Sequence, residues 1–344
     1  MPQVIVSTTT TLDGYLDDNT ANRLILSSEE DMYDMHRLRA RVDAIVIGAK
    51  TLRKDNPRLD TRYAERQPEP PPVKVVITRS GAIPPAARFF SEGPGKKIVL
   101  CLPDTPLQNL DLLSSVATVV LCRPEITAKT IIDYLTSIGL TKIMVEGGAA
   151  TQEMFFAEAC VDILRLGHAP LLLGSSGGAR FLSSANFTPA TLTTLSVEKL
   201  GDTTVSWYQV KSNAHLLRRA ANLISQPPPE RALRSPGGTI ILNKHGIEIT
   251  GTYGELLSVE DATETALIKA QNLNIDIEGA SVFASGELNL LSHAIAESFC
   301  SLLLKSRIKR LVMPTRQNVE TEAIEERFTC LKSAGIAVER YDIS

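Results

Sequence analysis

Two arginines lie close together in the part of the sequence that is richest in residues able to do chemistry. The stretch HRLRARVDAIVIGAKTLRKDNPRLDTRY carries Arg39 on an expected helix and Arg62 in a basic turn, with a short apolar strand between them. A guanidinium group keeps its charge and can bind two phosphate oxygens at once. Arg39 and Arg62 could therefore converge on one phosphate group. The alternative is a solvated helix face followed by a charged loop.

A second candidate site follows the strand-like run TKIMV, where Glu146 and two glycines precede the helix-like run TQEMFFAEA. The backbone amides at a helix N-terminus favour anions, so this turn could bind the pyrophosphate of a dinucleotide. It lacks the G-x-G-x-x-G spacing of a Rossmann fingerprint and could also be a simple tight connection. Glu146 lies at the carboxyl end of the strand, where open α/β sheets bind ligands, or it caps the next helix.

A third candidate is Arg79 in the turn Thr78-Arg79-Ser80, directly after the strand-like run VKVVI. An arginine at a strand end could bind the 2′-phosphate of an adenosine. An ordinary polar turn is the alternative.

An alternation of strands and helices is expected to position these residues. Ser27 and Ser28 open a helix that places Met32, Met35, Leu38 and Val42 at an approximate helical period. The β-rich runs VIVSTTTT, DAIVIG, VKVVIT, KKIVLCL, TVVLC and TKIMV read as buried strands. The pattern predicts an α/β fold.

Length and composition predict two domains and a small ligand. The 344 residues exceed the usual size of one compact core, and the pattern changes after the strand-like TTVSWYQV, so we expect domains at 1–212 and 213–344. A net charge of −3 gives no bulk attraction to nucleic acid or to an anionic membrane. With no secretory leader and no long apolar run, we expect a cytoplasmic protein, and its five cysteines are expected to be reduced thiols.

Taken together, STTTTLDG, HRLRARVDAIVIGAKTLRKDNPRL, MVEGGAA and VDILRLGHAPLLLGSSGGARF resemble the reductase domain of the bifunctional riboflavin-biosynthesis deaminase/reductase family in order and spacing. The resemblance covers residues 1 to about 210. It implies a dihydrofolate-reductase-like fold. It also implies NADPH-dependent reduction of the ribosyl group of 5-amino-6-(5-phosphoribosylamino)uracil to a ribityl chain, without a nucleophilic side chain or a metal ligand.

The resemblance further implies which residues bind the two ligands. The substrate would contact Arg39, Leu59, Arg62 and Glu146. NADPH would contact Thr9, Thr51, Asp55, Gly148, Ala149, Ala150, Thr151, Gln152, Glu153 and Met154, and Arg79 joins this set from its place at a strand end. Two positions depart from the bacterial pattern, because Arg23 and Ile25 stand where a serine and a tryptophan are expected.

The C-terminal part resembles the cytidine-deaminase-like α/β/α fold through GASVFASGEL and LLLKSRIKRLVM. A zinc deaminase of this type needs H-x-E and P-C-x-x-C ligands. The approximately equivalent positions hold Asp261, Thr263, Leu288 and Asn289, with the lone thiol of Cys300 near the last ligand. We therefore expect a degenerate, metal-free deaminase-like domain that packs, dimerises or binds a ligand, in a protein that forms a homodimer.

Two other functions stay open. Arg23 and Ile25 motivate an NADPH-dependent reductase of another pterin or pyrimidine. A non-catalytic nucleotide-binding sensor is the third possibility, and the presence of Thr51, Asp55 and Arg62 argues against it.

Overall fold

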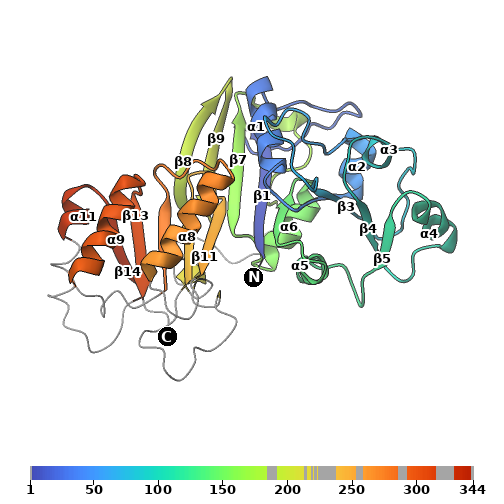
Figure 1. Cartoon of the computed structure of the whole chain (residues 1–344). Helices are drawn as coiled ribbons and strands as arrows, with labels where there is room; N and C mark the ends of the chain where they lie inside the picture. Colours follow the sequence, from blue (N-terminus) through green and yellow to red (C-terminus); the bar gives the residue numbers. More distant parts are fainter. Residues whose placement is uncertain are drawn as a thin grey trace. The chain divides into compact units, whose positions relative to one another are not determined.

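The computed structural model describes residues 2–183, 192–212, 215–217, 220, 223, 238–252, 259–285, 293–314 and 329–341. The chain divides into two compact units, which are described separately below (Figure 1). Unit 1 is Met1–Val210 and unit 2 is Lys211–Ser344. This division lies two residues before the domain boundary expected from the sequence.

Unit 1 is built on one nine-stranded sheet with the order β5-β4-β3-β2-β6-β1-β7-β9-β8. The first seven of these strands are parallel, and β8 and β9 form an antiparallel hairpin whose β9 pairs with β7. The strands are β1 (Gln3–Thr11), β2 (Ala44–Gly48), β3 (Val73–Ile77), β4 (Lys97–Cys101), β5 (Thr118–Leu121), β6 (Lys142–Val145), β7 (Ile163–Ala169), β8 (Thr193–Leu200) and β9 (Thr203–Gln209).

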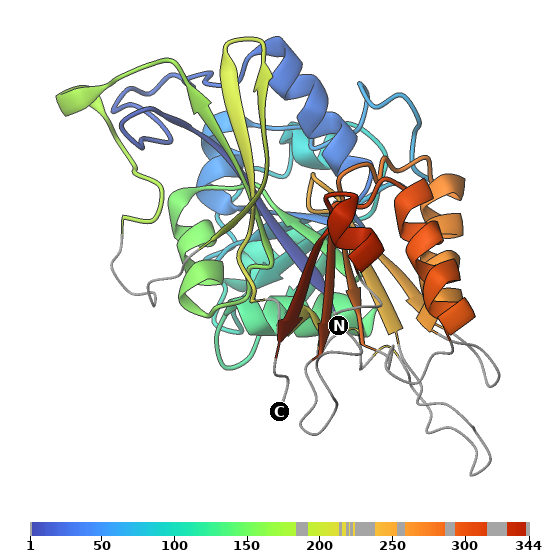
Figure 2. The same cartoon turned by 90° about the vertical axis from the view of Figure 1, so that its left-hand side faces the viewer.

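Helices cover both faces of this sheet, and Figure 2 shows α1 on one side of the central strands and α6 on the other. Alternate strand residues such as Val4 and Val46 pack in one core cluster with Ile131 of α5 and Phe155 of α6. Their neighbours along the strand point to the opposite face, as Ile45 does, and are equally buried. The helices are α1 (Glu29–Arg39), α2 (Ala49–Asp55), α3 (Arg88–Ser91), α4 (Leu107–Ser114), α5 (Ala128–Ser137) and α6 (Ala149–Ala157), with a 3₁₀ turn η1 (Gly174–Ser176).

The apolar stripe predicted for the first helix is only partly right. Leu38 is buried, but Met32 is 40% exposed and Val42 lies beyond the end of α1. Asp31 and His36 are buried instead. The buried face of α1 therefore carries polar side chains, which need partners inside the protein.

Unit 2 contains a five-stranded sheet with the order β11-β10-β12-β13-β14. β10 is antiparallel to β11 and to β12, whereas β12, β13 and β14 are parallel. Helix α8 packs against β10 and β11. The elements are β10 (Gly238–Leu242), β11 (Glu248–Thr252), α8 (Val259–Asn272), β12 (Ser281–Ala284), α9 (His293–Lys305), β13 (Arg310–Pro314), α11 (Thr329–Ser333) and β14 (Ala337–Tyr341).

The positions expected to have lost zinc ligands are only partly visible in unit 2. Thr263 of α8 is fully buried, and its hydroxyl lies 3.1 Å from the hydroxyl of Thr239. Cys300 of α9 is buried, while Leu288, Asn289 and the side chain of Asp261 lie outside the described residues. Within the described part of the chain, no group of three or more His, Cys, Asp and Glu side chains could hold a metal ion. The described helices also include none with the length and apolarity to span a bilayer.

Candidate active site

A cavity of about 560 Å³ opens in unit 1 at the carboxyl ends of its central parallel strands. Its walls include Thr8 and Thr9 of β1, Gly48 at the end of β2, and Glu146 in the turn after β6. β6 follows β5 in the chain but lies between β1 and β2 in the sheet. Open α/β sheets form ligand crevices where the strand order changes in this way.

Most of the residues expected to bind ligands line this one cavity. They are Thr9, Arg39, Thr51, Asp55, Leu59, Arg62, Glu146, Gly148, Ala149, Ala150, Thr151, Gln152 and Glu153. Arg79 and Met154 are not among the lining residues. The Arg79 side chain is exposed and its backbone carbonyl accepts a hydrogen bond from Thr105, whereas Met154 packs against the core of unit 1. Their binding roles stay predictions.

The deepest charged contact in the cavity wall joins Arg39 of α1 to Glu146. Arg39 donates from Nε to Oε1 and from Nη2 to Oε2, both over 2.7 Å, and the two side chains are only 14% and 8% exposed. Burial disfavours the charged guanidinium, but Glu146 outweighs this effect and raises the pKa of Arg39. Each oxygen of the carboxylate thereby accepts one hydrogen bond from Arg39. A solvated helix face, the alternative for Arg39, is therefore wrong.

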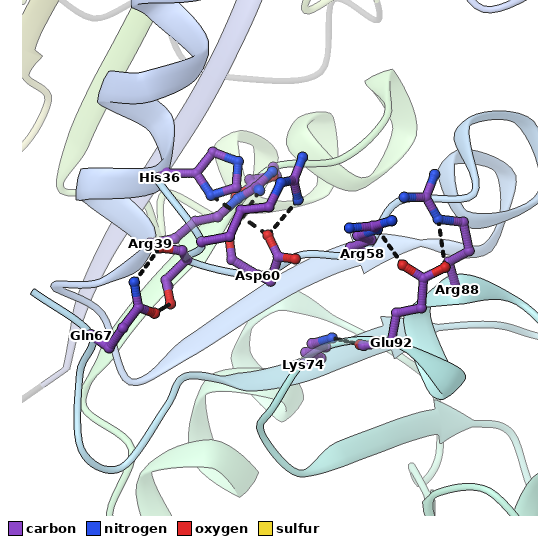
Figure 3. Close-up of polar contacts among 11 residues, drawn as sticks. His36, Arg39, Arg58, Asp60, Gln67, Lys74, Arg88 and Glu92 are labelled. Atoms are coloured by element: carbon purple, nitrogen blue, oxygen red, sulfur yellow. Dashed lines mark hydrogen bonds and ion pairs between the residues drawn. The ribbon is translucent and has the colours of Figure 1, made fainter. Parts of the chain in front are cut away.

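Asp60 connects Arg39 to Arg62 (Figure 3). Its backbone carbonyl accepts from Arg39 Nη1 over 3.3 Å, and its carboxylate accepts from Arg62 Nη1 over 2.5 Å. Arg62 remains 37% exposed and lies over the ring of Tyr63. Of the two arginines, Arg62 is thus the one that is free to reach a ligand from this cavity wall.

His36 lies beside the same carboxylate and was not among the expected site residues. Its Nδ1 is 3.6 Å from Asp60 Oδ1, it has no hydrogen-bond partner among the described residues, and the side chain is 2% exposed. Burial, followed by the charges of Arg39 and Arg62, lowers the pKa of His36 to about 4. The imidazole is therefore neutral near pH 7. The available signal was its position three residues before Arg39, which places both on one side of a helix.

The turn after β6 forms a wall suited to a phosphate-bearing cofactor. Gly148 is the N-cap of α6 with a φ of 72°, a conformation that favours glycine, and no side chain caps the helix. A Cβ added at Gly48 would lie 2.6 Å from Thr151 Oγ1, so the two chain segments approach closely only because position 48 is a glycine. Gln152 is 1% exposed, and its Oε1 lacks a hydrogen bond to any described group. These features fit a bound nucleotide.

Thr9 of β1, which also lines the cavity, is held by a buried ion cluster. Its hydroxyl donates to Asp31 Oδ2 over 3.1 Å and accepts from Ser27 Oγ over 3.2 Å. Asp31 in turn pairs with Arg165 of β7 over 2.5 Å, with both side chains completely buried. Ser27 lines the cavity as Thr9 does, whereas Asp31 and Arg165 do not, so the orientation of Thr9 is fixed in part by buried residues outside the cavity wall.

Comparison with known proteins places this site in a family. Residues 2–206 match the model of the RibD C-terminal domain. The chain belongs to the RibD C-terminal domain family. The chain is 30% identical over 182 residues to an Archaeoglobus fulgidus protein named 2,5-diamino-6-ribosylamino-4(3H)-pyrimidinone 5′-phosphate reductase. This match covers 50% of this chain and 82% of the relative.

The chain also resembles full-length RibD proteins over part of their length. It is 29% identical to the riboflavin biosynthesis protein RibD of Chlamydia trachomatis, with 52% of this chain matching 48% of that protein. It therefore spans about half the length of this relative. The RibD C-terminal domain match ends at residue 206, so unit 2 lies outside it.

Solved structures support the fold of unit 1. Acinetobacter baumannii RibD superimposes with a TM-score of 0.53 at 22% identity, covering 62% of this chain and 59% of that one. A pyrimidine reductase-like protein from Corynebacterium diphtheriae gives 0.52 at 21% identity, covering 61% and 92%. The predicted α/β fold and the predicted reductase family of the N-terminal unit are thus confirmed.

Proposed function

We propose that unit 1 is an NADPH-dependent reductase that converts the ribosyl group of 5-amino-6-(5-phosphoribosylamino)uracil to a ribityl group in riboflavin biosynthesis. The observation that carries this proposal is the convergence of Arg62, Glu146 and the turn after β6 on one cavity, in a chain of the RibD C-terminal domain family. A reductase of this kind needs a nucleotide wall and an anion-binding wall that face the same space.

On the cofactor side, the candidate contacts are Thr9, Thr51, Asp55 and residues 148–153, all in the cavity wall. NADPH would supply the hydride when bound. The first turn of α6 offers backbone amides to the pyrophosphate, and Gln152 offers a buried carbonyl oxygen that lacks a described partner. Burial raises the pKa of Asp55 in this wall. Arg79 and Met154 stay candidates from the sequence alone.

On the substrate side, residues of the chain orient the sugar and bind its charged 5′-phosphate. We assign no side chain as a nucleophile. Glu146, fixed in both directions by Arg39, presents an oriented carboxylate to the polar ring of the pyrimidine. Leu59 is 2% exposed and lines the same cavity. Arg62 is the candidate for the 5′-phosphate, because its guanidinium keeps 37% of its surface exposed.

A second candidate substrate is favoured by the name of the Archaeoglobus fulgidus relative, which acts on the diaminopyrimidinone. This compound carries an amino group at carbon 2 of the ring, where the uracil carries an oxygen. Both compounds have the same phosphorylated ribosyl group, so the same residues would serve for either.

Oxidation of NADPH by the purified protein tests these proposals. Turnover with the uracil compound supports the first, turnover with the diaminopyrimidinone supports the second, and turnover only with another pterin or pyrimidine contradicts both. Binding of NADPH without any turnover indicates a sensor. In the active protein, Arg62→Ala should lower kcat/KM about tenfold or more, because a charge-assisted hydrogen bond contributes about 1.5 to 3 kcal/mol. Arg66→Ala, an exposed arginine that does not line the cavity, is the matched control.

For unit 2 we propose a deaminase-like domain without catalytic zinc. Its support is the strand order of the sheet, in which β10 is antiparallel to both of its neighbours and β12, β13 and β14 are parallel, and the buried Thr263 on α8. We further propose that the protein is a homodimer, which sedimentation analysis of the full chain would test.

A further inference from the structure

A second pair of arginines lines the same cavity beyond Arg62. Arg58 and Arg88 flank the carboxylate of Glu92: Arg58 pairs with Oε2, and Arg88 donates from Nε to Oε1 over 3.0 Å (Figure 3). Both arginines belong to the cavity wall, whereas Glu92 does not. Their side chains are 38% and 42% exposed.

The charges in this part of the wall do not cancel. Arg39 is matched by Glu146 and Arg62 by Asp60, but Arg58 and Arg88 share the single carboxylate of Glu92. Among these groups, one positive charge is therefore in excess in the wall of the cavity that Arg62 also lines. A phosphate monoester carries between one and two negative charges near neutral pH, and planar guanidinium groups bind its oxygens in pairs.

The pair is also held in place by the surrounding chain. Asn56, at the end of α2, accepts a hydrogen bond from the backbone amide of Arg88 over 2.8 Å, which fixes the start of α3. The fully buried Lys74 donates from Nζ to the backbone carbonyl of Glu92 over 2.6 Å. The backbones of Arg88 and Glu92 are thus anchored by contacts other than the ion pairs, as expected for a preorganised binding site.

We propose that Arg58 and Arg88 form a phosphate-monoester subsite of this cavity, and that its occupant is the 5′-phosphate of the substrate. This assignment rests on the proposed function. The other phosphate monoester in that reaction is the 2′-phosphate of NADPH. The substrate is favoured because Arg58 directly precedes Leu59 in the wall that leads to Arg62. In the occupied site, the phosphate takes over guanidinium hydrogen bonds that Glu92 accepts in the empty one.

Binding of ribose 5-phosphate, measured by titration calorimetry on the full chain, tests the subsite without any turnover. The protein should bind ribose 5-phosphate more tightly than ribose, and Arg58→Met/Arg88→Met should weaken the phosphate compound about tenfold or more while leaving ribose unchanged. Arg53→Met is the matched control, because Arg53 binds the carbonyl of Ala82 outside the cavity wall. Equal affinity of the double variant and the unaltered protein for ribose 5-phosphate would overturn the proposal.

Two further measurements identify the compound that supplies the phosphate and keep the test valid if the double variant does not fold. If the double variant loses affinity for adenosine 2′-monophosphate instead, the subsite belongs to the cofactor and our assignment is wrong. If the double variant does not fold, the Glu92→Gln variant tests whether the two arginines bind the phosphate. Removal of the competing carboxylate should tighten ribose 5-phosphate binding severalfold. Unchanged or weaker binding by Glu92→Gln would contradict the subsite. Because these are binding measurements, the subsite can hold even if the proposed reaction fails.

Discussion

Removal of Arg39 should destabilise unit 1 much more than removal of an exposed arginine on the same helix. The Arg39→Met variant keeps the length of the side chain but leaves the carboxylate of Glu146, 8% exposed, without its two 2.7 Å partners. Loss of one member of a buried ion pair costs about 3 to 5 kcal/mol. Because Arg39 is still 14% exposed, we expect a loss of about 3 kcal/mol in the free energy of unfolding.

A second substitution shows how much of this loss in stability comes from the buried Glu146 carboxylate that has lost its partner. In Arg39→Met/Glu146→Met both charges are gone, and apolar side chains fill similar space. The double variant should be more stable than Arg39→Met by about 1 to 2 kcal/mol, although it has lost one more native side chain. kcat/KM should fall in all these variants, since Glu146 is proposed to contact the substrate.

Urea unfolding followed by tryptophan fluorescence measures these changes in unit 1 alone. The sequence contains a single tryptophan, and Trp207 lies on β9 of unit 1 with 2% exposure. A signal from one unit avoids the mixed transition expected of a chain with two units. The control is Arg37→Met, which removes a surface pair with Glu65 (52% and 77% exposed) and should cost less than about 1 kcal/mol. Equal losses for Arg39→Met and Arg37→Met would refute the reasoning.

Three other outcomes follow from the site and from unit 2. The pKa of His36 falls from 6.5 to about 4 in the folded protein, so the unfolded chain takes up a proton first as the pH drops. His36 should therefore remove about 1 to 3 kcal/mol of stability between about pH 6.5 and pH 4, and His36→Gln should flatten this part of the stability profile in acid titrations. Arg79→Ala should narrow the preference for NADPH over NADH, and equal use of both cofactors by the unaltered protein would contradict the role of Arg79. Protein purified without chelator should hold no stoichiometric zinc and should release no ammonia from the aminated pyrimidine precursor. Stoichiometric zinc together with sustained ammonia release would show that the zinc ligands of unit 2 were misplaced.

The sequence predicted the elements of unit 1 that carry a strong local signal. The runs that became β1, β2 and β6 are rich in β-branched residues and end at glycine-containing or polar turns, as buried parallel strands do. Gly148 could be placed at a helix start for the same local reason. By contrast, β8 was missed, because its side chains are half-buried or exposed and its threonines, serine and charged residues give no apolar run.

Partnerships across the sheet could not be predicted, since they depend on strand order. Arg39 and Glu146 are 107 positions apart in the chain, and although the resemblance assigned both to the substrate, nothing in the sequence indicated that they pair with each other. The sequence suggested that Arg39 would reach a phosphate, whereas in the structure its Nε and Nη2 donate to Glu146 and its Nη1 donates to the carbonyl of Asp60. In the same way, the buried Asp31 of α1 makes sense only beside Arg165, which comes from β7.

The position of β1 at the centre of the sheet has a consequence for how unit 1 reaches its native state. This strand is made before the other strands of unit 1, yet its two neighbours are Lys142–Val145 and Ile163–Ala169. Its backbone hydrogen bonds must wait until most of the unit has left the ribosome, so folding begins with pairings that are distant along the chain. Contacts of large sequence separation slow folding and leave apolar strands exposed in the meantime. We expect unit 1 to refold slowly after dilution from denaturant and to depend on chaperones more than its size alone suggests.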